Sequence, residues 1–194
     1  MSNFPLTDLA SLLKERDKGL IADWELKPAA VLVPVFFKED EYHLLFTRRN
    51  DNLRQHPGQI SFPGGRQDPT DTSLLETALR ETEEEIGLKR KDVKILGELD
   101  DMMTSTQYRI TPFACTFPYP YNFVISKEEI SHLIEVPLSM FFKPEIREVK
   151  QFTIYKNNVV DVYYYHIGPE PIWGATARIV RHFLELINPM LNLG

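Results

Sequence analysis

The chain contains one cysteine, Cys115, among its 194 residues. A single cysteine cannot form an internal disulfide, and so little cysteine is typical of proteins that remain in a reducing compartment. The neighbouring residues Phe113, Ala114 and Phe117 are apolar, which favours a core position for the thiol over a nucleophilic one. The composition therefore excludes a fold that internal disulfides hold together.

Long apolar segments and an excess of basic residues are also lacking. No apolar run approaches the ~20 residues that span a membrane, and the first twenty residues are too polar for a signal peptide. The net charge of −6 at pH 7 provides no overall positive field for nucleic acid or an anionic membrane. We therefore expect a cytoplasmic protein without such partners. The oligomeric state is left open, a homodimer included.

The length and the 43% share of hydrophobic residues suit one globular domain, residues 1–194, with residues 1–28 as an N-terminal helical extension. Helices are expected over residues 6–18, 73–86, 137–142 and 176–193, and strands over 29–37, 42–49, 93–99, 108–117, 152–155 and 159–167. Residues 29–37 are expected to be buried on both faces despite Pro34, residues 50–72 to form a long turn-rich segment, and the last two strands to form a hairpin at Asn157 and Asn158. Because helices and strands do not alternate regularly, the order favours an α/β (α+β) architecture with a mixed sheet between helices over a doubly wound sheet.

The helix expected over residues 73–86 has clear ends and an apolar side. Ser73 and Glu76 form a capping box at its start, and Gly87 is typical of the position just after a helix. At about 100° per residue, one arc faces the core and consists of Leu75, Ala78, Leu79, Thr82 and Ile86. Glu83 lies on another face, where we expect a solvated side chain.

Three glutamates, Glu81, Glu84 and Glu85, share a separate arc of this helix. Their like charges repel one another, so a cation is expected to offset them. Arg80 lies four residues after Glu76 and four before Glu84, where its guanidinium can brace the acidic surface. Converging carboxylates suit a hard divalent cation such as Mg²⁺, which substrate phosphates commonly share. The alternative is an acidic face that simply contacts solvent.

The segment before the helix has the opposite charge. Residues 46–66 contain four arginines and one acid, whereas residues 67–85 contain seven acids and one arginine. A basic loop with adjacent glycines before an acidic helix suits a phosphorylated ligand, because arginines and backbone N–H groups hold phosphate oxygens. Taken alone, Gly64 and Gly65 are equally consistent with a plain turn, and His56 with a hydrogen bond inside the loop.

Together these residues resemble the Nudix box, a pattern written G-x5-E-x7-R-E-U-x-E-E-x-G-U in which U is aliphatic. Gly65 begins the box and the run RETEEEIGL completes it, so that it covers residues 65–88. Two positions depart from the pattern. Asp71 takes the place of the first acid, with eight residues instead of seven before Arg80, and Thr82 occupies an aliphatic position. The extra residue bears on the role of Asp71, not on the fold.

The stretch LLFTRRNDNLRQHPGQISFPGG, residues 44–65, is similar to the signature that precedes the box in the coenzyme A pyrophosphatase branch. The match includes Arg54, Gly58 and residues 62–65, while Asn50 departs from it. That branch also carries the extra residue and an Asp inside the box. The runs YRITPFA, EEISHLIEVPL and IWGATARIV extend the resemblance from residue 29 to the C-terminus.

The resemblance implies a Nudix-type α/β/α sandwich and metal-dependent hydrolysis of a pyrophosphate bond. For coenzyme A or its derivatives, the products would be 3′,5′-ADP and 4′-phosphopantetheine or its acyl form. Mg²⁺, or Mn²⁺ in its place, would be held by Glu81, Glu84 and Glu85. Arg80 would keep these glutamates in position. The implied substrate residues are Arg54 for a phosphate, Arg49 and His56 behind it, and Gly64 and Gly65 for close approach of the backbone.

Two candidates remain for the general base. Glu129 lies far from the box in sequence, and the alternative interpretation makes it the acidic first turn of a helix capped by Ser126. Glu85 is the other candidate. Two other functions also stay open. A Nudix enzyme for ADP-ribose or a dinucleotide such as NADH would keep the box without needing the upstream signature, and a non-catalytic nucleotide-binding domain would be expected to lack part of the glutamate triad.

Overall fold

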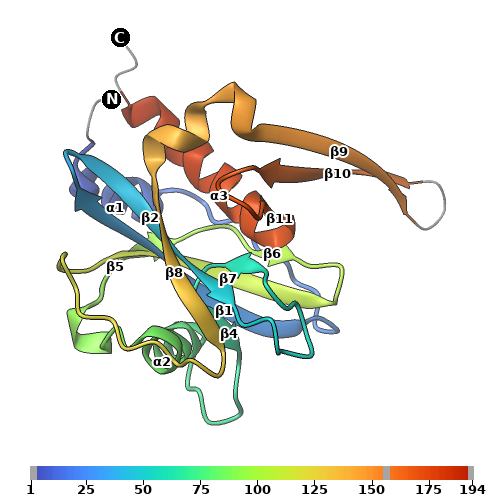
Figure 1. Cartoon of the computed structure of the whole chain (residues 1–194), viewed down its shortest axis with the longest axis horizontal. Coiled ribbons are helices and arrows are strands. Elements are labelled where there is room, and N and C mark those ends of the chain that lie inside the picture. The colour runs from blue at the N-terminus through green and yellow to red at the C-terminus, as the bar shows by residue number, and fades with distance from the viewer. Residues whose placement is uncertain (1–3, 155–157, 192–194) are drawn as a thin grey trace.

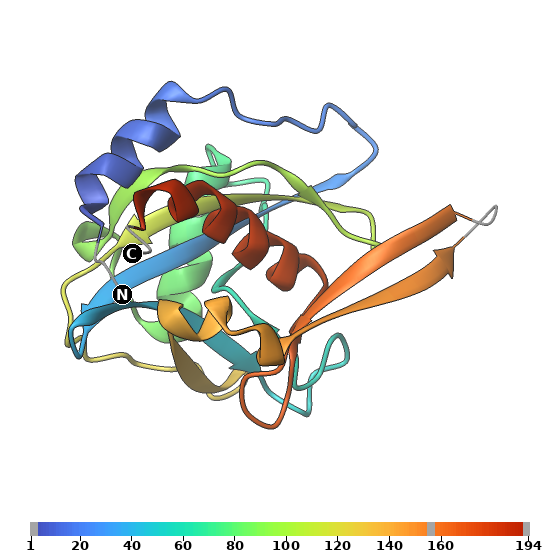
Figure 2. The ribbon, with the colours of Figure 1, turned by 90° about the horizontal axis from the view of Figure 1, so that it is seen from above.

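The computed structural model describes residues 4–154 and 158–191. A mixed β-sheet lies between helices, with α2 (Leu74–Ile86) on one face and α3 (Gly174–Ile187) with α1 (Leu6–Glu15) on the other (Figures 1 and 2). The expected mixed sheet between helices is therefore confirmed. Among the described residues, no helix has the length and apolar character needed to cross a membrane.

The main sheet has eight strands and a second sheet has three. The main sheet comprises β1 (Lys27–Lys38), β2 (Glu41–Arg49), β3 (Ile60–Ser61), β4 (Gly64–Arg66), β5 (Lys94–Glu98), β6 (Met102–Met103), β7 (Tyr108–Thr116) and β8 (Ile130–Pro137), and the smaller sheet β9 (Arg147–Ile154), β10 (Asn158–Tyr165) and β11 (Ile172–Trp173). The described residues also include the short 3₁₀ segments η1 (Arg90–Asp92), η2 (Leu138–Phe142), η3 (Pro144–Ile146) and η5 (Asn188–Met190).

Strand β1 is the centre of the main sheet, and it changes partners along its length. It pairs in parallel with β7 on one side. On the other side it pairs antiparallel with β4 over residues 29–31 and then with β2 over residues 35–38. The amide of Leu32 bonds the carbonyl of Pro63, so the nitrogen of Pro34, two residues later, points the same way into the gap between β4 and β2. Proline is tolerated here because no neighbouring strand needs its missing N–H.

Both faces of β1 are buried, as expected from its continuous apolar run. Val33 and Val35 belong to the large core cluster beneath α1 and α3. Ala30 and Leu32 pack on the opposite face with Ala78 of α2 and with Cys115 of β7. Cys115 is fully buried, and burial raises the pKa of its thiol, which agrees with a core role.

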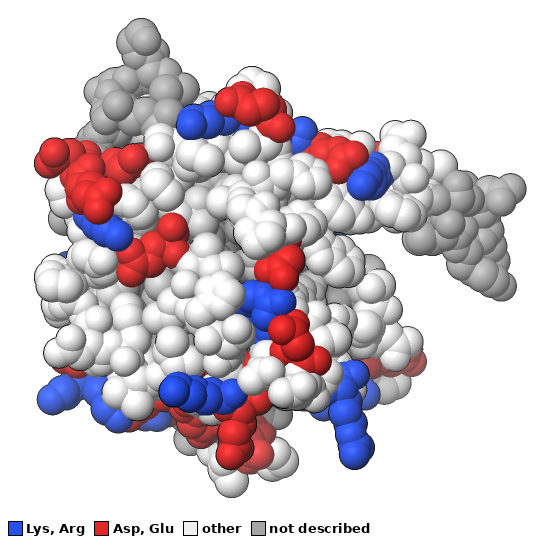
Figure 3. Space-filling view, viewed as in Figure 1, with Lys and Arg blue, Asp and Glu red and all other residues white. Residues whose placement is uncertain are grey.

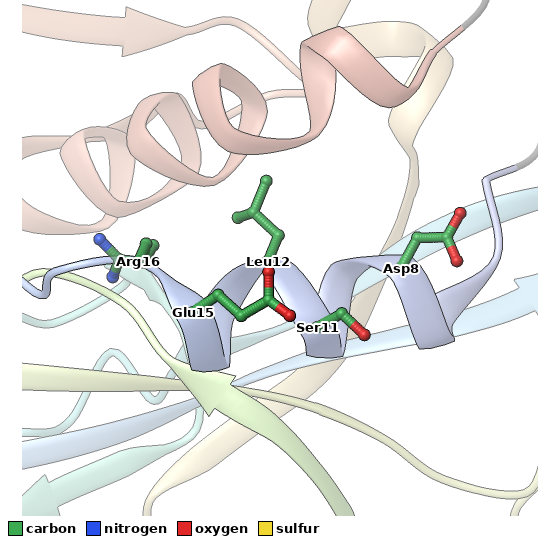
Figure 4. Close-up of a pocket in the computed structure, with 5 residues that line it drawn as sticks. All are labelled: Asp8, Ser11, Leu12, Glu15 and Arg16. Atoms are coloured by element: carbon green, nitrogen blue, oxygen red, sulfur yellow. The ribbon is translucent and has the colours of Figure 1, made fainter.

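Helix α1 packs on β5 at the edge of the sheet. Leu9 and Leu13 are buried, and a Cβ on Gly97 would lie only 2.5 Å from the Leu13 Cβ, so the helix approaches the strand where the strand has no side chain. Figure 4 shows Leu12 pointing toward α3, whereas Asp8, Ser11 and Glu15 of the same helix do not. The helix was expected to continue to residue 18 but ends at Glu15, because Arg16 is extended and binds Asp100.

Several expected elements have different limits or were missed. The segment expected as turns over residues 50–72 contains the short strands β3 and β4, and β8 was not expected at all. The expected helix over residues 137–142 is the 3₁₀ segment η2. Helix α3 begins at Gly174 and ends at Ile187, two residues before Pro189, instead of covering residues 176–193.

Strands β9 and β10 of the smaller sheet form an arm that projects from the body of the molecule (Figures 1 and 2). Strand β9 starts at Arg147, five residues earlier than expected, and pairs with β10 in register, with Phe152 opposite Val160. The hairpin itself is thus confirmed. Of the two expected turn residues, Asn158 begins β10, and Asn157 lies outside the described residues.

Replacing Leu9 by alanine tests the contribution of α1. Leu9 is fully buried in the large core cluster, so Leu9→Ala should lower the free energy of unfolding by about 2–4 kcal/mol through lost burial and a residual cavity. Urea denaturation measures the change. Leu20→Ala is the control, since Leu20 is 72% exposed. Equal stability of the two variants would show that α1 is not part of the folded core.

Candidate active site

Helix α2 presents the acidic residues because its other side is fixed to the sheet. Ala78, Thr82 and Ile86 are fully buried. Ser73 caps the first turn by accepting a 3.1 Å hydrogen bond from the Glu76 amide, and Gly87 ends the helix in the left-handed region at φ 72°. Both ends of the helix therefore lie where the sequence predicted, although the Glu76 side chain of the expected capping box pairs with Arg90. Figure 3 shows acidic and basic side chains gathered along the lower edge of the molecule, where α2 lies in Figure 1.

Strand β4 lies directly against the carboxylates of α2. The Gly64 amide donates a 3.1 Å hydrogen bond to Oε2 of Glu85. A Cβ on Gly65 would lie 2.5 Å from the Glu81 carboxyl carbon, and one on Gly64, at φ 142°, would lie 2.3 Å from the Ala30 carbonyl oxygen. A side chain at position 64 would collide with the backbone of β1, whereas one at position 65 would displace the Glu81 carboxyl. The two glycines thus allow close approach to β1 and to the helix, which a plain turn would not demand.

Glu85 and Glu84 differ sharply in environment although they are adjacent in sequence. The Glu85 residue is 3% exposed, and burial raises the pKa of its carboxyl to about 8, only partly offset by the Gly64 amide. Glu81, on the same side of the helix, also has a pKa raised by burial. The Glu84 side chain is 58% exposed. The three glutamates that were predicted to share one arc of the helix therefore range from the buried Glu85 to the exposed Glu84.

Arg80 binds two carboxylate oxygens on each side of its guanidinium and so holds part of the acidic cluster formed by Glu81, Glu84 and Glu85. Its Nε and Nη2 bind the two oxygens of Asp71, both at 2.9 Å. Its Nη1 binds Glu81 Oε1 at 3.0 Å and Glu84 Oε2 at 3.1 Å. The expected brace between Arg80 and Glu84 is present. The expected contact with Glu76 is not, because Glu76 pairs with Arg90 at 2.9 Å.

Asp71 is the buried counter-ion of Arg80. Its side chain is 5% exposed and also accepts a 2.9 Å hydrogen bond from the Thr77 hydroxyl. The Arg80 guanidinium holds the pKa of the Asp71 carboxyl well below its usual range. Although the sequence pattern has one extra residue between Asp71 and Arg80, Asp71 still reaches the Arg80 guanidinium. Glu83 was expected to be solvated but instead pairs with Lys89 at 3.1 Å.

The two general-base candidates lie near each other. The charges of Glu129 and Glu81 both raise the pKa of Glu85, whereas the charge of Arg49 lowers it. Glu129 precedes β8, so the alternative interpretation that placed it in a helix is wrong. Its segment is fastened to the end of α2, because the Ser126 amide bonds the Glu85 carbonyl at 2.9 Å. The structure thus brings Glu129 toward the buried end of the acidic cluster.

The expected substrate residues fall into two groups. Arg49 ends β2, faces Glu85 and has a buried Nε without a hydrogen-bond partner among the described residues. Arg54 and His56 lie on an exposed loop, and within residues 4–154 and 158–191 no hydrogen bond or ion pair joins either side chain to the carboxylates. Arg49 therefore has the better position next to the acidic cluster.

The donor set fits a hard divalent cation. Glu85 is a buried carboxylate with one N–H donor and with like charges beside it, an arrangement that a cation would stabilise. In the described part of the chain no three acidic, histidine or cysteine side chains already converge as a metal-binding group. Arg80 instead engages oxygens of Glu81 and Glu84. Glu81, Glu84 and Glu85 are the residues that would hold the ion.

Two arginines have roles that the sequence did not indicate. Arg48 pairs with Glu170, 122 residues later in the chain. Arg66 donates to Gln55 at 2.7 Å, and its guanidinium lies 5.1 Å from the centre of the Tyr108 ring. No local spacing could reveal either contact, since the partners lie on separate elements.

Comparison with known proteins matches this arrangement to one family. The model of the NUDIX domain matches residues 26–162. Proteins of Yersinia enterocolitica and Yersinia pestis, each called an uncharacterized Nudix hydrolase NudL, are 38% identical over 161 residues. These alignments cover 82% of this chain and 81% and 79% of the two relatives.

Solved structures show the same fold at low sequence identity. A NUDIX hydrolase from Alicyclobacillus acidocaldarius superposes with a TM-score of 0.52 and 21% identity, covering 62% of this chain and 82% of its own. A MutT/nudix family protein from Enterococcus faecalis has a TM-score of 0.54 and 11% identity, covering 95% of this chain and 70% of its own. At these identities the likeness concerns the fold alone.

Asp71→Asn tests the anchor of the acidic cluster. Removing the buried charge leaves Arg80 with its carboxylate partners on one side only, so the variant should lose about 2–4 kcal/mol of unfolding free energy at neutral pH. Because the folded-state pKa of Asp71 is depressed, its stabilisation is present above the unfolded pKa of about 3.9 and is lost as the pH falls through the lower folded-state value. Denaturation between pH 7 and pH 3 measures both effects.

Glu76→Gln is the matched control for Asp71→Asn. It removes one carboxylate charge from the same helix, but its pair with Arg90 is exposed, so it should change stability by less than about 1 kcal/mol. A loss in Asp71→Asn no larger than in this control, or one that persists unchanged at pH 3, would contradict the anchoring role.

Proposed function

Since this chain belongs to the Nudix hydrolase family, we propose that it hydrolyses the pyrophosphate bond of coenzyme A or its derivatives. The products are 3′,5′-ADP and 4′-phosphopantetheine, or the acyl form of the latter. The observation that carries the proposal is the loop that resembles the coenzyme A branch, which runs directly into Gly64 and Gly65 beside Glu81 and Glu85. A cytoplasmic location and Mg²⁺ or Mn²⁺ as the metal belong to the same proposal.

The hydrolysis requires water to attack phosphorus against the negative charge of the phosphate oxygens. The oxygen of water forms a bond to one phosphorus while the bridging P–O bond breaks, the departing phosphate keeps the electron pair of that bond, and the proton of the water passes to a carboxylate base. Glu81, Glu84 and Glu85 would hold a divalent cation, which would supply charge neutralisation and a more acidic water. Arg80 keeps two of these carboxylates in place.

The remaining roles follow from position. Glu85 or Glu129 accepts the proton of the attacking water. Arg49 contacts a substrate phosphate close to the carboxylates, since its charge already acts on the buried Glu85. Arg54 supplies a second cationic contact from the exposed loop.

A Nudix enzyme for ADP-ribose or NADH is the second candidate. It would use the same carboxylates, and the names of the Yersinia relatives state no substrate. What favours coenzyme A is the basic loop of residues 46–66, because coenzyme A carries a 3′-phosphate that simpler ADP derivatives lack. A non-catalytic binding domain would not need the complete set of glutamates.

Glu85→Gln tests the catalytic cluster. The substitution removes the charge and keeps the shape, so kcat at limiting Mg²⁺ should fall by about 10²- to 10⁴-fold while circular dichroism and thermal unfolding remain close to wild type. Glu83→Gln is the control on the same helix, since Glu83 binds Lys89 away from the cluster, and should retain activity. Near-normal turnover by Glu85→Gln would show that this helix takes no part in the reaction.

Dephospho-coenzyme A separates the coenzyme A proposal from the family as a whole. It lacks only the 3′-phosphate, and losing one charge-assisted contact should lower kcat/KM by roughly 10- to 150-fold relative to coenzyme A. ADP-ribose, without the phosphate and the pantetheine arm, should be poorer still. Steady-state assays of all three substrates with the same enzyme preparation give the comparison. Equal values would leave the hydrolase standing and exclude coenzyme A as its preferred substrate.

A further inference from the structure

The loop of residues 50–59 is closed by an ion-pair network around Arg48, the second-to-last residue of β2. The two terminal nitrogens of Arg48 bind the two oxygens of Asp51 at 2.9 Å and 3.2 Å. On its other side, Nε and Nη2 bind the two oxygens of Glu170 at 2.8 Å and 2.7 Å. The Arg48 side chain is 12% exposed. One guanidinium thus joins the start of the loop to a segment near the C-terminus through two bidentate contacts.

The far end of the same loop also returns to Arg48. Gly58 has a φ of 68°, and a Cβ there would lie 3.1 Å from Oδ1 of Asp51 and 3.2 Å from Nη2 of Arg48. The base of the loop is closed by a backbone hydrogen bond from the Arg49 amide to the Gln59 carbonyl at 3.0 Å. The residues between these closures, Arg54 among them, are mostly exposed. The network therefore sets the ends of the loop that carries Arg54.

Arg48 itself is not available to a substrate. The hydrogen bonds that it donates to Glu170 and Asp51 raise the pKa of its guanidinium, and four of its N–H directions point to these two carboxylates. The sequence counted Arg48 among the arginines that could meet a phosphate. Its position makes it a structural residue, which leaves Arg49, Arg54 and Arg66 as the cations of this loop.

Glu170 lies between β10 and β11, beyond the part of the chain that the family model matches, residues 26–162. In Figure 2 the teal loop that follows β2 and the red-orange segment that precedes β11 lie next to each other, as the ion pair requires. Residues near the C-terminus thus reach into the loop that the sequence signature placed at the substrate. This contact links two parts of the chain that have no common strand pairing at that point.

We propose that Glu170 is a positioning residue for the substrate-binding loop of residues 50–59. It fixes the guanidinium of Arg48, Arg48 fixes Asp51 and the turn at Gly58, and the closed loop holds Arg54 in reach of a substrate phosphate. The proposal rests on the proposed function for the identity of the ligand, an anionic phosphate group, and not for the closure of the loop. Glu170 is 40% exposed and Arg48 keeps Asp51 as a second partner, so loss of the Glu170 contact should cost little global stability, open the loop and leave the fold intact.

Glu170→Gln tests the closure without any substrate. The variant keeps the shape of the side chain and loses the charge, so trypsin should cut after Arg54 several times faster than in the wild-type protein, followed as fragments 1–54 and 55–194 by mass spectrometry. Glu185→Gln is the matched control, because Glu185 also pairs with an arginine, Arg181, at 2.7 Å on the exposed side of α3. The control should be cut at the wild-type rate. Equal rates in all three proteins would overturn the proposal.

Steady-state kinetics then show whether the closed loop serves the substrate. Glu170→Gln should raise KM for coenzyme A by about 3- to 10-fold, the range expected for ordering one long side chain on binding, with kcat within about twofold. In an Arg54→Ala background the same substitution should have no further effect on KM, because the two residues act through one contact. Additive effects of the two substitutions, or a loss confined to kcat, would overturn the positioning role. Glu170→Asp, which keeps the charge, should restore part of the wild-type KM.

A failure of the positioning role of Glu170 can be told apart from a failure of the proposed function. If the wild-type enzyme cleaves ADP-ribose and not coenzyme A, the coenzyme A proposal fails, and the double-mutant comparison is made on ADP-ribose. The trypsin result does not depend on either substrate. Thermal unfolding of Glu170→Gln within about 2 °C of the wild type, the effect of a fraction of 1 kcal/mol in a chain of this size, confirms that a faster cut reports the loop and not the whole fold.

Discussion

The contact between Arg80 and four carboxyl oxygens is the interaction on which the rest of the site depends. Charge repulsion between Glu81, Glu84 and their neighbours opposes the folding of the helix that carries them, and burial of Glu81 adds a desolvation cost. Arg80 offsets both because it is itself held by the buried carboxylate of Asp71. Glu81 and Glu84 therefore have a cationic partner within the chain, whereas Glu85 forms no ion pair with a described residue and is influenced by the charge of Arg49.

The position of β4 follows from this arrangement. Where β4 pairs with β1 beside the carboxylates of α2, a side chain at position 64 would collide with the β1 backbone and one at position 65 with the Glu81 carboxyl. Gly64 and Gly65 occupy these positions, and the Gly64 amide reaches Glu85. The same closeness keeps water from Glu85 and raises its pKa. One steric requirement thus produces both the open backbone at the site and the altered acidity of its most buried carboxylate. The α2 face of β1, formed by Ala30 and Leu32, supports this packing from below.

The sequence predicted those features whose causes are local. The cap at Ser73, the left-handed Gly87 and the two-sided burial of β1 each follow from a short run of residues, and each is present. Partners distant in sequence were not predictable in the same way. Helical spacing placed Arg80 between Glu76 and Glu84, but Glu76 pairs with Arg90 of the following segment η1. The ion pair of Arg48 with Glu170 joins residues 122 positions apart. Strand β8 was missed because its run ISHLIEVP does not alternate regularly, and β2 supplies the pairing that makes it a strand. The roles of the site residues toward metal and substrate remain proposals, since they concern groups that the chain alone does not contain.

The arm formed by β9 and β10 bears on how this chain can change over evolution. Its outer part pairs mainly with itself, and apolar residues such as Phe152 and Val159 stay about half exposed there. Only its base is built into the core, through Tyr165. Insertions or deletions of paired residues along the arm would therefore alter its reach without repacking the sheet that supports the glutamates. The molecule combines a centre in which almost every position is sterically constrained with one appendage whose length is free to vary.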